Sequence, residues 1–234
     1  MSERHTLRIG AVAAIFGGIV LVVGNIFHPR EPGQLDNARN LLQVVAGSDI
    51  WVADHVLILI GIALFLGAFY GLTHSITSKS GTAWARLAWA VAIIGVGLGL
   101  AFMLTEVVAL PSLADTWANS SGVEKDLALA AGSAIFQLSL TLSAGAPLFL
   151  FGIVPALYGV AMLGSDDYAP WLGWVGVIFG SVSTVASVIQ LFTGVTTLTG
   201  LVLVPIGIFV ITLWTIYLGV LMWRKSGEVG TKPS

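Results

Sequence analysis

The sequence predicts an all-α membrane protein, a bundle of six transmembrane helices with a short amphipathic helix on its outer surface. Hydrophobic residues make up 56% of the 234 positions and charged residues only 9%, and the mean hydropathy is +0.95. Soluble domains carry roughly 25% charged residues, so this chain has too few to cover a surface that faces water. Six apolar runs of spanning length and an uneven distribution of basic residues complete the prediction.

Composition also excludes several function classes. A net charge of −2 with scattered Lys and Arg leaves no basic face for nucleic acid. The absence of Cys excludes disulfides, thiolate metal sites and thiol catalysis. The partners that remain are membrane lipid and a lipophilic small molecule.

The first three predicted spans cover residues 7–27, 52–72 and 83–110. The first ends at His28-Pro29 and the third at Pro111, because proline disfavours continuation of a helix. Arg4 and Arg8 before the first run resemble the start of a signal peptide. The run lacks a good small-x-small cleavage site, however, so we expect it to be retained as a span.

Residues 30–50 form the longest polar connection and contain apolar residues at helical spacing after Asp36. These residues are Leu35, Ala38, Leu41, Leu42 and Val45. The pattern predicts a short helix lying on the membrane surface. We expect residues 30–50 and 111–143 to fold over the outer mouth of the bundle as a partial lid.

Residues 124–163 are too many for one ordinary span. The second half, 146–163, is apolar enough to cross, whereas the first half is rich in Ser and Thr. We expect one helix that begins outside the membrane at 124 and bends near Gly145–Pro147; two separate crossings are the alternative. Spans at 171–192 and 201–223 complete a single transmembrane domain over residues 1–234.

Basic residues favour one orientation of this bundle. With six spans, one side receives Arg4, Arg8, Lys79, Arg86, Arg224, Lys225 and Lys232, and the other receives Arg30, Arg39 and Lys125. Because basic residues concentrate in cytoplasmic segments, both termini are expected in the cytoplasm, with the protein in the inner or plasma membrane.

Pairs of glycines four residues apart predict close helix packing within this bundle. The pairs are Gly67 and Gly71, Gly95 and Gly99, and Gly176 and Gly180.

The start of the fifth span carries a resemblance to a known family. Pro170-Trp171-Leu172-Gly173-Trp174 opens a late span after a short loop. This start resembles that of a broad family of uncharacterised bacterial six-span membrane proteins. The resemblance implies six helices and a bacterial membrane protein, and it implies no activity.

Ionisable side chains gather at the predicted outer ends of the first three spans. His28 ends the first span, Asp54 and His55 begin the second, and Glu106 lies near the end of the third. Such groups are costly inside a membrane unless they are paired or face water, so they mark a candidate site. Polar residues at a similar depth that are expected to bind a ligand are Asn25, Asp54, Gln137 and Gln190.

Three chemical roles fit these residues. His28, His55 and Glu106 form a set that binds zinc or iron, and two imidazoles at one depth can also hold a haem. Alternatively, Glu106 acts as a catalytic proton donor with His55 as its partner. Asp54 is the weaker candidate, because one residue along a helix turns it roughly 100° from His55.

Structural roles are also open at this point. Asp54 can cap the second span, and Gln137 and Gln190 can form hydrogen bonds between helices. The function expected is therefore an outward-facing polar pocket that binds a metal, a haem or a small lipophilic ligand. A membrane-embedded acid–base enzyme, of the cyclase or isomerase type, and a non-catalytic scaffold or accessory subunit are the alternatives.

Overall fold

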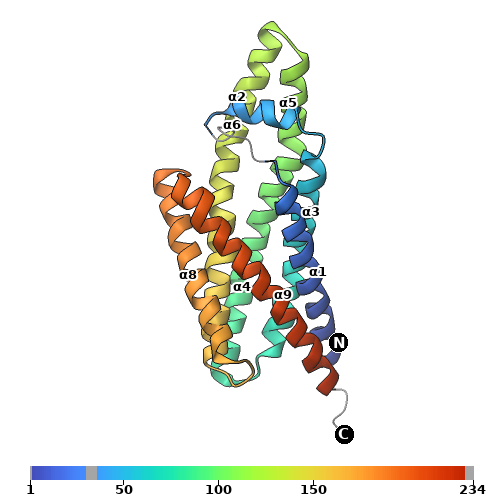
Figure 1. Ribbon diagram of the computed structural model, residues 1–234, viewed down its shortest axis with the longest axis vertical. Helices are drawn as coiled ribbons and strands as arrows, with labels where there is room; N and C mark the ends of the chain where they lie inside the picture. The colour runs from blue at the N-terminus through green and yellow to red at the C-terminus, as the bar shows by residue number, and fades with distance from the viewer. Residues whose placement is uncertain (1, 30–35, 230–234) are drawn as a thin grey trace.

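The computed structural model describes residues 2–29 and 36–229, and within these ranges the chain is helical without a β-strand. Six of its helical stretches are long and apolar enough to cross a membrane. The predicted all-α membrane bundle is therefore confirmed. Figure 1 shows the helices packed side by side, with both termini at one end and α2 near the other.

The bundle is built from nine α-helices in the described part of the chain. They are α1 (Glu3–Phe27), α2 (Ala38–Ala46), α3 (Trp51–Ser75), α4 (Lys79–Leu104), α5 (Leu110–Asn119), α6 (Gly122–Pro147), α7 (Val154–Leu163), α8 (Pro170–Thr193) and α9 (Val204–Val229). Three π-helical turns lie at Thr105–Ala109, Leu148–Ile153 and Thr197–Leu203.

Two of the helical stretches are about twice the length that a bilayer requires. Lys79–Asn119 covers 41 residues and Gly122–Leu163 covers 42, whereas roughly 20 residues span the hydrocarbon layer. Their ends, α5 and the first part of α6, project as a helical hairpin beyond the other helices (Figure 1). The chain from 124 to 163 is thus one continuous helical stretch, as expected.

The expected end of the third span at Pro111 was wrong, and the π-helical turns explain why. Leu110 N–H bonds to the carbonyl of Thr105, five residues back. In that register position 111 would donate to Glu106, and proline leaves this carbonyl free without breaking the helix. Pro155 and Pro205 likewise stand second in the α-helices that follow the other two π-helical turns.

Helices α1 and α3 approach closely along glycines. A Cβ added to Gly10 would lie 2.5 Å from the Cα of Gly71, and one added to Gly24 would lie 2.7 Å from Ile58 Cγ1. The glycine pairs predicted to mediate packing also lie at close contacts: Gly95 meets Leu150, and Gly176 meets the carbonyl of Pro155. Small residues therefore set the helix spacing in a membrane, where apolar burial alone gives little driving force.

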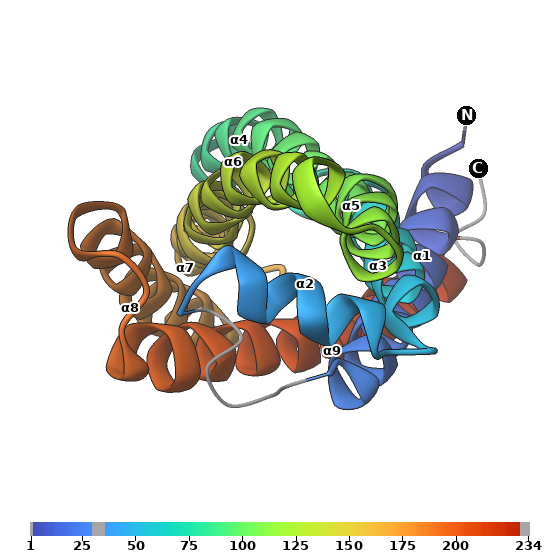
Figure 2. The ribbon, with the colours of Figure 1, turned by 90° about the horizontal axis from the view of Figure 1, so that it is seen from above.

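Helix α2 lies across the end of the bundle opposite the termini (Figure 2). Asn37 caps it by accepting a hydrogen bond from the N–H of Asn40. Its apolar face packs on α5 and α6, with Leu42 fully buried against Gly132. The part of 30–50 that the structure describes thus covers the mouth as expected, while residues 30–35, including Leu35, lie outside the described residues. Helix α5 and the first part of α6 extend outward as the hairpin and do not fold over the mouth, whereas the last part of 111–143 lies within the bundle, where Phe136 packs in a core cluster with Leu41 and Leu42.

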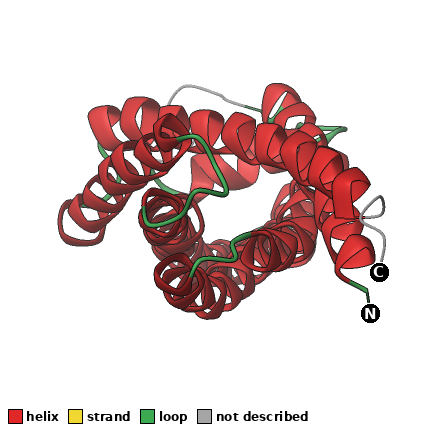
Figure 3. Ribbon diagram, turned by 90° about the horizontal axis from the view of Figure 1, so that it is seen from below, coloured by secondary structure: helices red, strands yellow, loops and turns green. Residues whose placement is uncertain are grey.

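Figure 3 looks onto the end of the bundle that carries the termini. Polar side chains join the helices there, and we call this cluster the interlock. Asp167 accepts hydrogen bonds from the Thr77 backbone N–H at 2.7 Å and from Ser165 Oγ at 2.6 Å, and Lys225 Nζ lies 3.5 Å away. Burial acts to raise the pKa of Asp167, but these hydrogen bonds and the Lys225 ammonium outweigh it and hold the pKa below its ordinary value. The interlock ties the α3–α4 and α7–α8 connections to α9.

Candidate metal centre

Two histidines and an aspartate meet where α1 ends and α3 begins. Pro29 follows His28, so α1 stops there and the imidazole stands at the helix end. Helix α3 starts at Trp51, which places Asp54 and His55 in its first turns. The close contact of Gly24 with α3 brings the two helix ends together.

Asp54 lies between the two imidazoles. One of its oxygens is 3.0 Å from His28 Nδ1, and the other is 3.1 Å from His55 Nδ1. The Asp54 side chain is only 2% exposed. Because an ionised carboxylate can only accept, both Nδ1 atoms donate in this arrangement.

His55 has its ring orientation fixed by its neighbours. Its Nδ1 lies 2.7 Å from the carbonyl oxygen of Trp51, and its ring stacks on the Trp51 ring with centroids 4.4 Å apart. A carbonyl can only accept, so the Nδ1 atom carries the proton and Nε2 is the free nitrogen. That Nε2 atom lies 3.8 Å from Glu106 Oε2.

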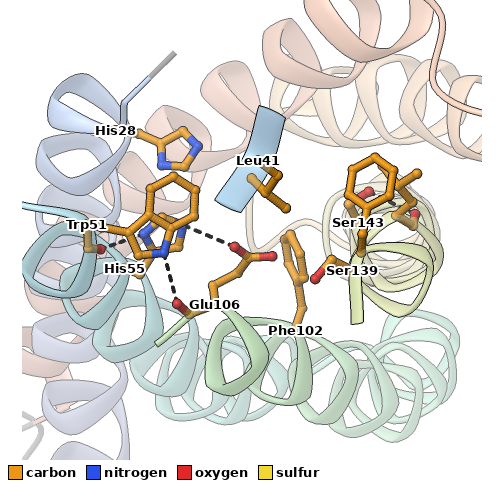
Figure 4. A pocket seen from close by; sticks show the side chains of 10 residues that line it. His28, Leu41, Trp51, His55, Phe102, Glu106, Ser139 and Ser143 are labelled. Carbon is orange, nitrogen blue, oxygen red and sulfur yellow. Dashed lines mark hydrogen bonds and ion pairs between the residues drawn. The ribbon is translucent and has the colours of Figure 1, made fainter. Parts of the chain in front are cut away.

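Glu106 approaches the histidines from the π-helical turn at Thr105–Ala109, which follows α4 (Figure 4). Its side chain is 7% exposed. The backbone carbonyl that Pro111 leaves free accepts a hydrogen bond from Trp51 Nε1 at 2.9 Å. Trp51 therefore connects Glu106 to His55, bonding the backbone of one and stacking on the ring of the other.

These groups line a cavity of about 80 Å³. Figure 4 shows the carboxylate of Glu106 facing His55, with Ser139 and Ser143 on the other side of the cavity and Leu41 of α2 close by. Among the described residues, the lining is His28, Leu41, Trp51, His55, Phe102, Glu106, Phe136, Ser139, Leu140 and Ser143. Since a water molecule needs roughly 10–15 Å³ of such volume, several water molecules or an ion with its waters fit.

The structure brings His28, His55 and Glu106 to one cavity, as the sequence indicated. The low weight given to Asp54 was wrong, because its carboxylate bonds to both imidazoles. Helical rotation separates neighbouring residues on one helix, but here His28 comes from another helix and the carboxylate has two oxygens to share.

The other predicted ligand-binding residues lie elsewhere. Asn25 lines a different pocket, between α1 and α9, and donates to the carbonyl of Leu21. Gln137 is exposed on α6, and Gln190 is buried on α8 beside Gly200. None of the three lines the histidine cavity.

Sequence reasoning missed Trp51 and the α6 wall. Trp51 precedes His55 by four residues, a spacing that places the two on one helix face. Phe136, Ser139, Leu140 and Ser143 share the spacing of a single helix face, which is a signal that this face points inward. The same face holds the Ser139 hydroxyl, which is buried.

The donor set has the chemistry of a transition-metal site. One ligand atom from each of His28, Asp54 and His55 lies within 4.8 Å of the others. Imidazole nitrogen and carboxylate oxygen are ligands that zinc and non-haem iron accept. Hydrogen bonds from ring N–H groups to a carboxylate and a backbone carbonyl are what orients histidine ligands in such sites.

Comparisons with protein families, curated proteins and solved structures return no match to this chain.

Proposed function

We propose that this protein is an integral membrane protein that binds one divalent transition-metal ion, zinc by its donor set, through the imidazoles of His28 and His55, whose rings Asp54 orients. The observation that carries the proposal is the convergence of these three buried or half-buried donors within 4.8 Å. His55 binds the ion through Nε2, because its Nδ1 is engaged by the Trp51 carbonyl. Glu106, 3.8 Å from that Nε2, then completes the site or holds a proton beside it.

Cavity size favours a metal ion over the larger ligands that the sequence left open. Small-molecule sites occupy roughly 300–1,000 Å³, and this cavity holds about 80 Å³. A haem or a whole lipophilic molecule does not fit that volume. A metal ion and one or two water molecules do.

The distribution of basic residues supports an orientation in which both termini are cytoplasmic. The metal site and α2 then lie toward the outer face of the membrane. In this orientation the exposed Trp84, Trp171 and Trp223, all near the termini end, form the cytoplasmic aromatic belt.

A second candidate function, acid–base catalysis at the ion, is favoured by the position of Glu106. Catalytic zinc sites have three protein ligands and an open position for water. Here the His28 and His55 rings, held by Asp54, lie on one side of the cavity, and the buried Glu106 carboxylate faces them from the π-helical turn that follows α4. With an ion held there, the ion would supply Lewis-acid polarisation, and this carboxylate could accept a proton and pass it to a leaving group.

Metal titration of the purified protein tests the proposal. The protein in detergent is stripped with a chelator, and zinc is added in competition with a chromophoric chelator. We expect one ion per chain, and a loss of affinity of about 100-fold or more in His28→Ala and in His55→Ala.

His74→Ala is the matched control, because His74 is exposed on the same helix as His55 and bonds to the carbonyl of Tyr70 in its own helix. Equal weakening in all three variants, or no tight ion in the wild type, would overturn the proposal.

A further inference from the structure

A second, larger pocket lies between α1 and α9. Its volume is about 400 Å³, five times that of the histidine cavity and within the roughly 300–1,000 Å³ range of small-molecule sites. The lining is Leu21, Val22, Asn25 and Ile26 of α1 with Pro205, Ile206, Ile208, Phe209 and Thr212 of α9. We call this pocket the α1–α9 groove.

The groove exists because the two helices cross and then diverge. Toward the termini they touch, where a Cβ added to Gly18 would lie 2.3 Å from Ile216 Cγ1 and one added to Gly219 would lie 2.9 Å from Ala14. Toward the α2 end they separate, as Figure 1 shows. The lining residues all belong to this open part of the crossing.

The groove faces the environment of a bilayer. Both of its walls belong to helices that are long and apolar enough to cross a membrane. The Asn25 amide donates to the carbonyl of Leu21 and the Thr212 hydroxyl to that of Ile208, each within its own helix. The remaining lining is aliphatic or aromatic, a surface that hydrocarbon covers without loss of hydrogen bonds.

The open end of the groove points toward the metal centre. Asn25 of the groove and His28 of the cavity are three residues apart on α1, roughly 4.5 Å along the helix axis. The His28 side chain is 24% exposed, the most exposed of the histidine and acidic groups that meet at the site. A long chain in the groove therefore places its polar end beside His28.

We propose that the α1–α9 groove holds one acyl chain of a membrane lipid, whose polar end lies at the His28 side of the metal centre. The inference rests on the proposed metal-binding function for the role of that polar end. The ligand of the groove is therefore a long-chain acylated amphiphile. The large groove binds the acyl chain, and the small polar cavity binds only the polar group that contacts the ion.

Photo-crosslinking in bilayer vesicles tests the groove. The protein is reconstituted with phosphatidylcholine carrying a diazirine on one acyl chain, irradiated and digested, and the adducts are located by mass spectrometry. We expect several-fold more adducts on residues 22–26 and 205–209 than on lipid-facing residues of α8, such as Val185. An even spread over all exposed helix faces would overturn the inference.

Two adjacent valines provide a matched pair of variants. Val22 lines the groove, whereas Val23 is exposed and lines no described pocket. Val22→Trp fills the groove and should abolish the α9 adducts, while Val23→Trp should leave them unchanged. Ile206→Trp, on the opposite wall, provides a second blocking variant in case Val22→Trp does not fold.

Zinc binding, measured on the same samples, separates the two proposals. Groove adducts missing from protein that binds zinc would overturn the lipid inference and leave the metal site intact. Groove adducts on protein that binds no zinc would support the chain site and overturn the metal function. A second lipid, with the diazirine at its glycerol ester, should label the peptide that contains His28; labelling elsewhere would overturn the placement of the polar end.

Discussion

Asp54 is the residue on which the geometry of the two histidines depends. It contributes one oxygen to each Nδ1 atom and is almost completely buried. A neutral amide in its place can accept from only one ring, and its NH₂ group would face the N–H of the other. Asp54 therefore sets which nitrogen each imidazole presents to an ion.

We predict that Asp54→Asn weakens zinc binding by about 10- to 100-fold, the range seen when groups that orient metal ligands are removed. The measurement is the same competition titration. Asp49→Asn is the control, since Asp49 is an exposed aspartate five residues earlier near the same end of the bundle. Unchanged affinity in Asp54→Asn would show that the histidines do not depend on it.

Trp51 and Pro111 form a second pair of residues that act together. The missing N–H of Pro111 leaves the Glu106 carbonyl free, and the Trp51 indole satisfies it. Trp51→Phe should destabilise the protein by about 1–3 kcal/mol, the usual cost of an unsatisfied buried polar group.

A double-mutant cycle tests this coupling. Pro111→Ala restores an N–H that can bond to the Glu106 carbonyl, so Trp51→Phe should cost less in that background, by about 0.5–3 kcal/mol. Thermal unfolding in detergent measures each variant. Costs that add within about 0.5 kcal/mol would mean that the two residues act independently.

Part of the site was accessible from the sequence because charge in an apolar helix is costly wherever it occurs. That cost singled out His28, His55 and Glu106 as functional candidates. Asp54 and Trp51 were undervalued because their roles depend on contacts between helices. No periodicity within α3 reveals that His28 of α1 or the carbonyl of Glu106 lies within hydrogen-bond distance.

Among the elements, α1 and α3 carry the site through their spacing. Gly24 stands directly against Ile58 and lies 3.1 Å, measured from an added Cβ, from the carbonyl of Asp54. Any side chain there must push the two helix ends apart. The distance between His28 and Asp54 is thus set by a glycine one turn away.

We predict that Gly24→Leu lowers stability by about 1–3 kcal/mol, the usual cost of overpacking, and weakens zinc binding about 10-fold or more. Thermal unfolding and zinc titration measure the two effects. Gly97→Leu serves as the control, because a Cβ at Gly97 meets nothing within 4 Å. If Gly24→Leu kept wild-type zinc affinity, the close approach would be irrelevant to the site.

The helices themselves were largely predictable, because spanning length and apolar composition are properties of a contiguous segment. All six spanning helices and the amphipathic α2 were expected. The continuation of α4 through Pro111 was not, since it depends on a π-helical turn that frees one carbonyl and on a tryptophan from α3 that satisfies it. Proline rules describe one helix in isolation, and here a neighbouring helix supplies the missing hydrogen bond.

At the scale of the whole molecule, the two ends of the bundle differ in their contacts and cavities. The α2 end carries the proposed metal centre and the open groove. The termini end is closed by the Asp167 interlock, in which Lys225 also lies over the ring of Tyr168 at 4.2 Å. Polar contacts therefore hold the helices together at the termini end, whereas both pockets lie toward the α2 end.

The interlock predicts a pH dependence of stability. Because the pKa of Asp167 is lowered in the folded protein, its contribution is complete above the unfolded value of about 3.9 and is lost as pH falls through the folded pKa. The melting temperature of the wild type should thus fall more steeply below about pH 4 than that of Asp167→Asn. Asp166→Asn, at the exposed neighbouring aspartate, should keep the wild-type profile; parallel profiles for the wild type and Asp167→Asn would rule out a role for this carboxylate.

The central claim concerns an ion held by two imidazoles at one end of a membrane bundle. Zinc K-edge X-ray absorption on the zinc-loaded protein measures it most directly, because the spectrum reports the ligand atoms and their distances. The structure predicts one zinc per chain with two imidazole nitrogens at about 2.0–2.1 Å and carboxylate or water oxygen at about 2.0–2.2 Å, and the loss of one imidazole in His28→Ala. A spectrum of oxygen ligands alone, or one unchanged in His28→Ala, would contradict it.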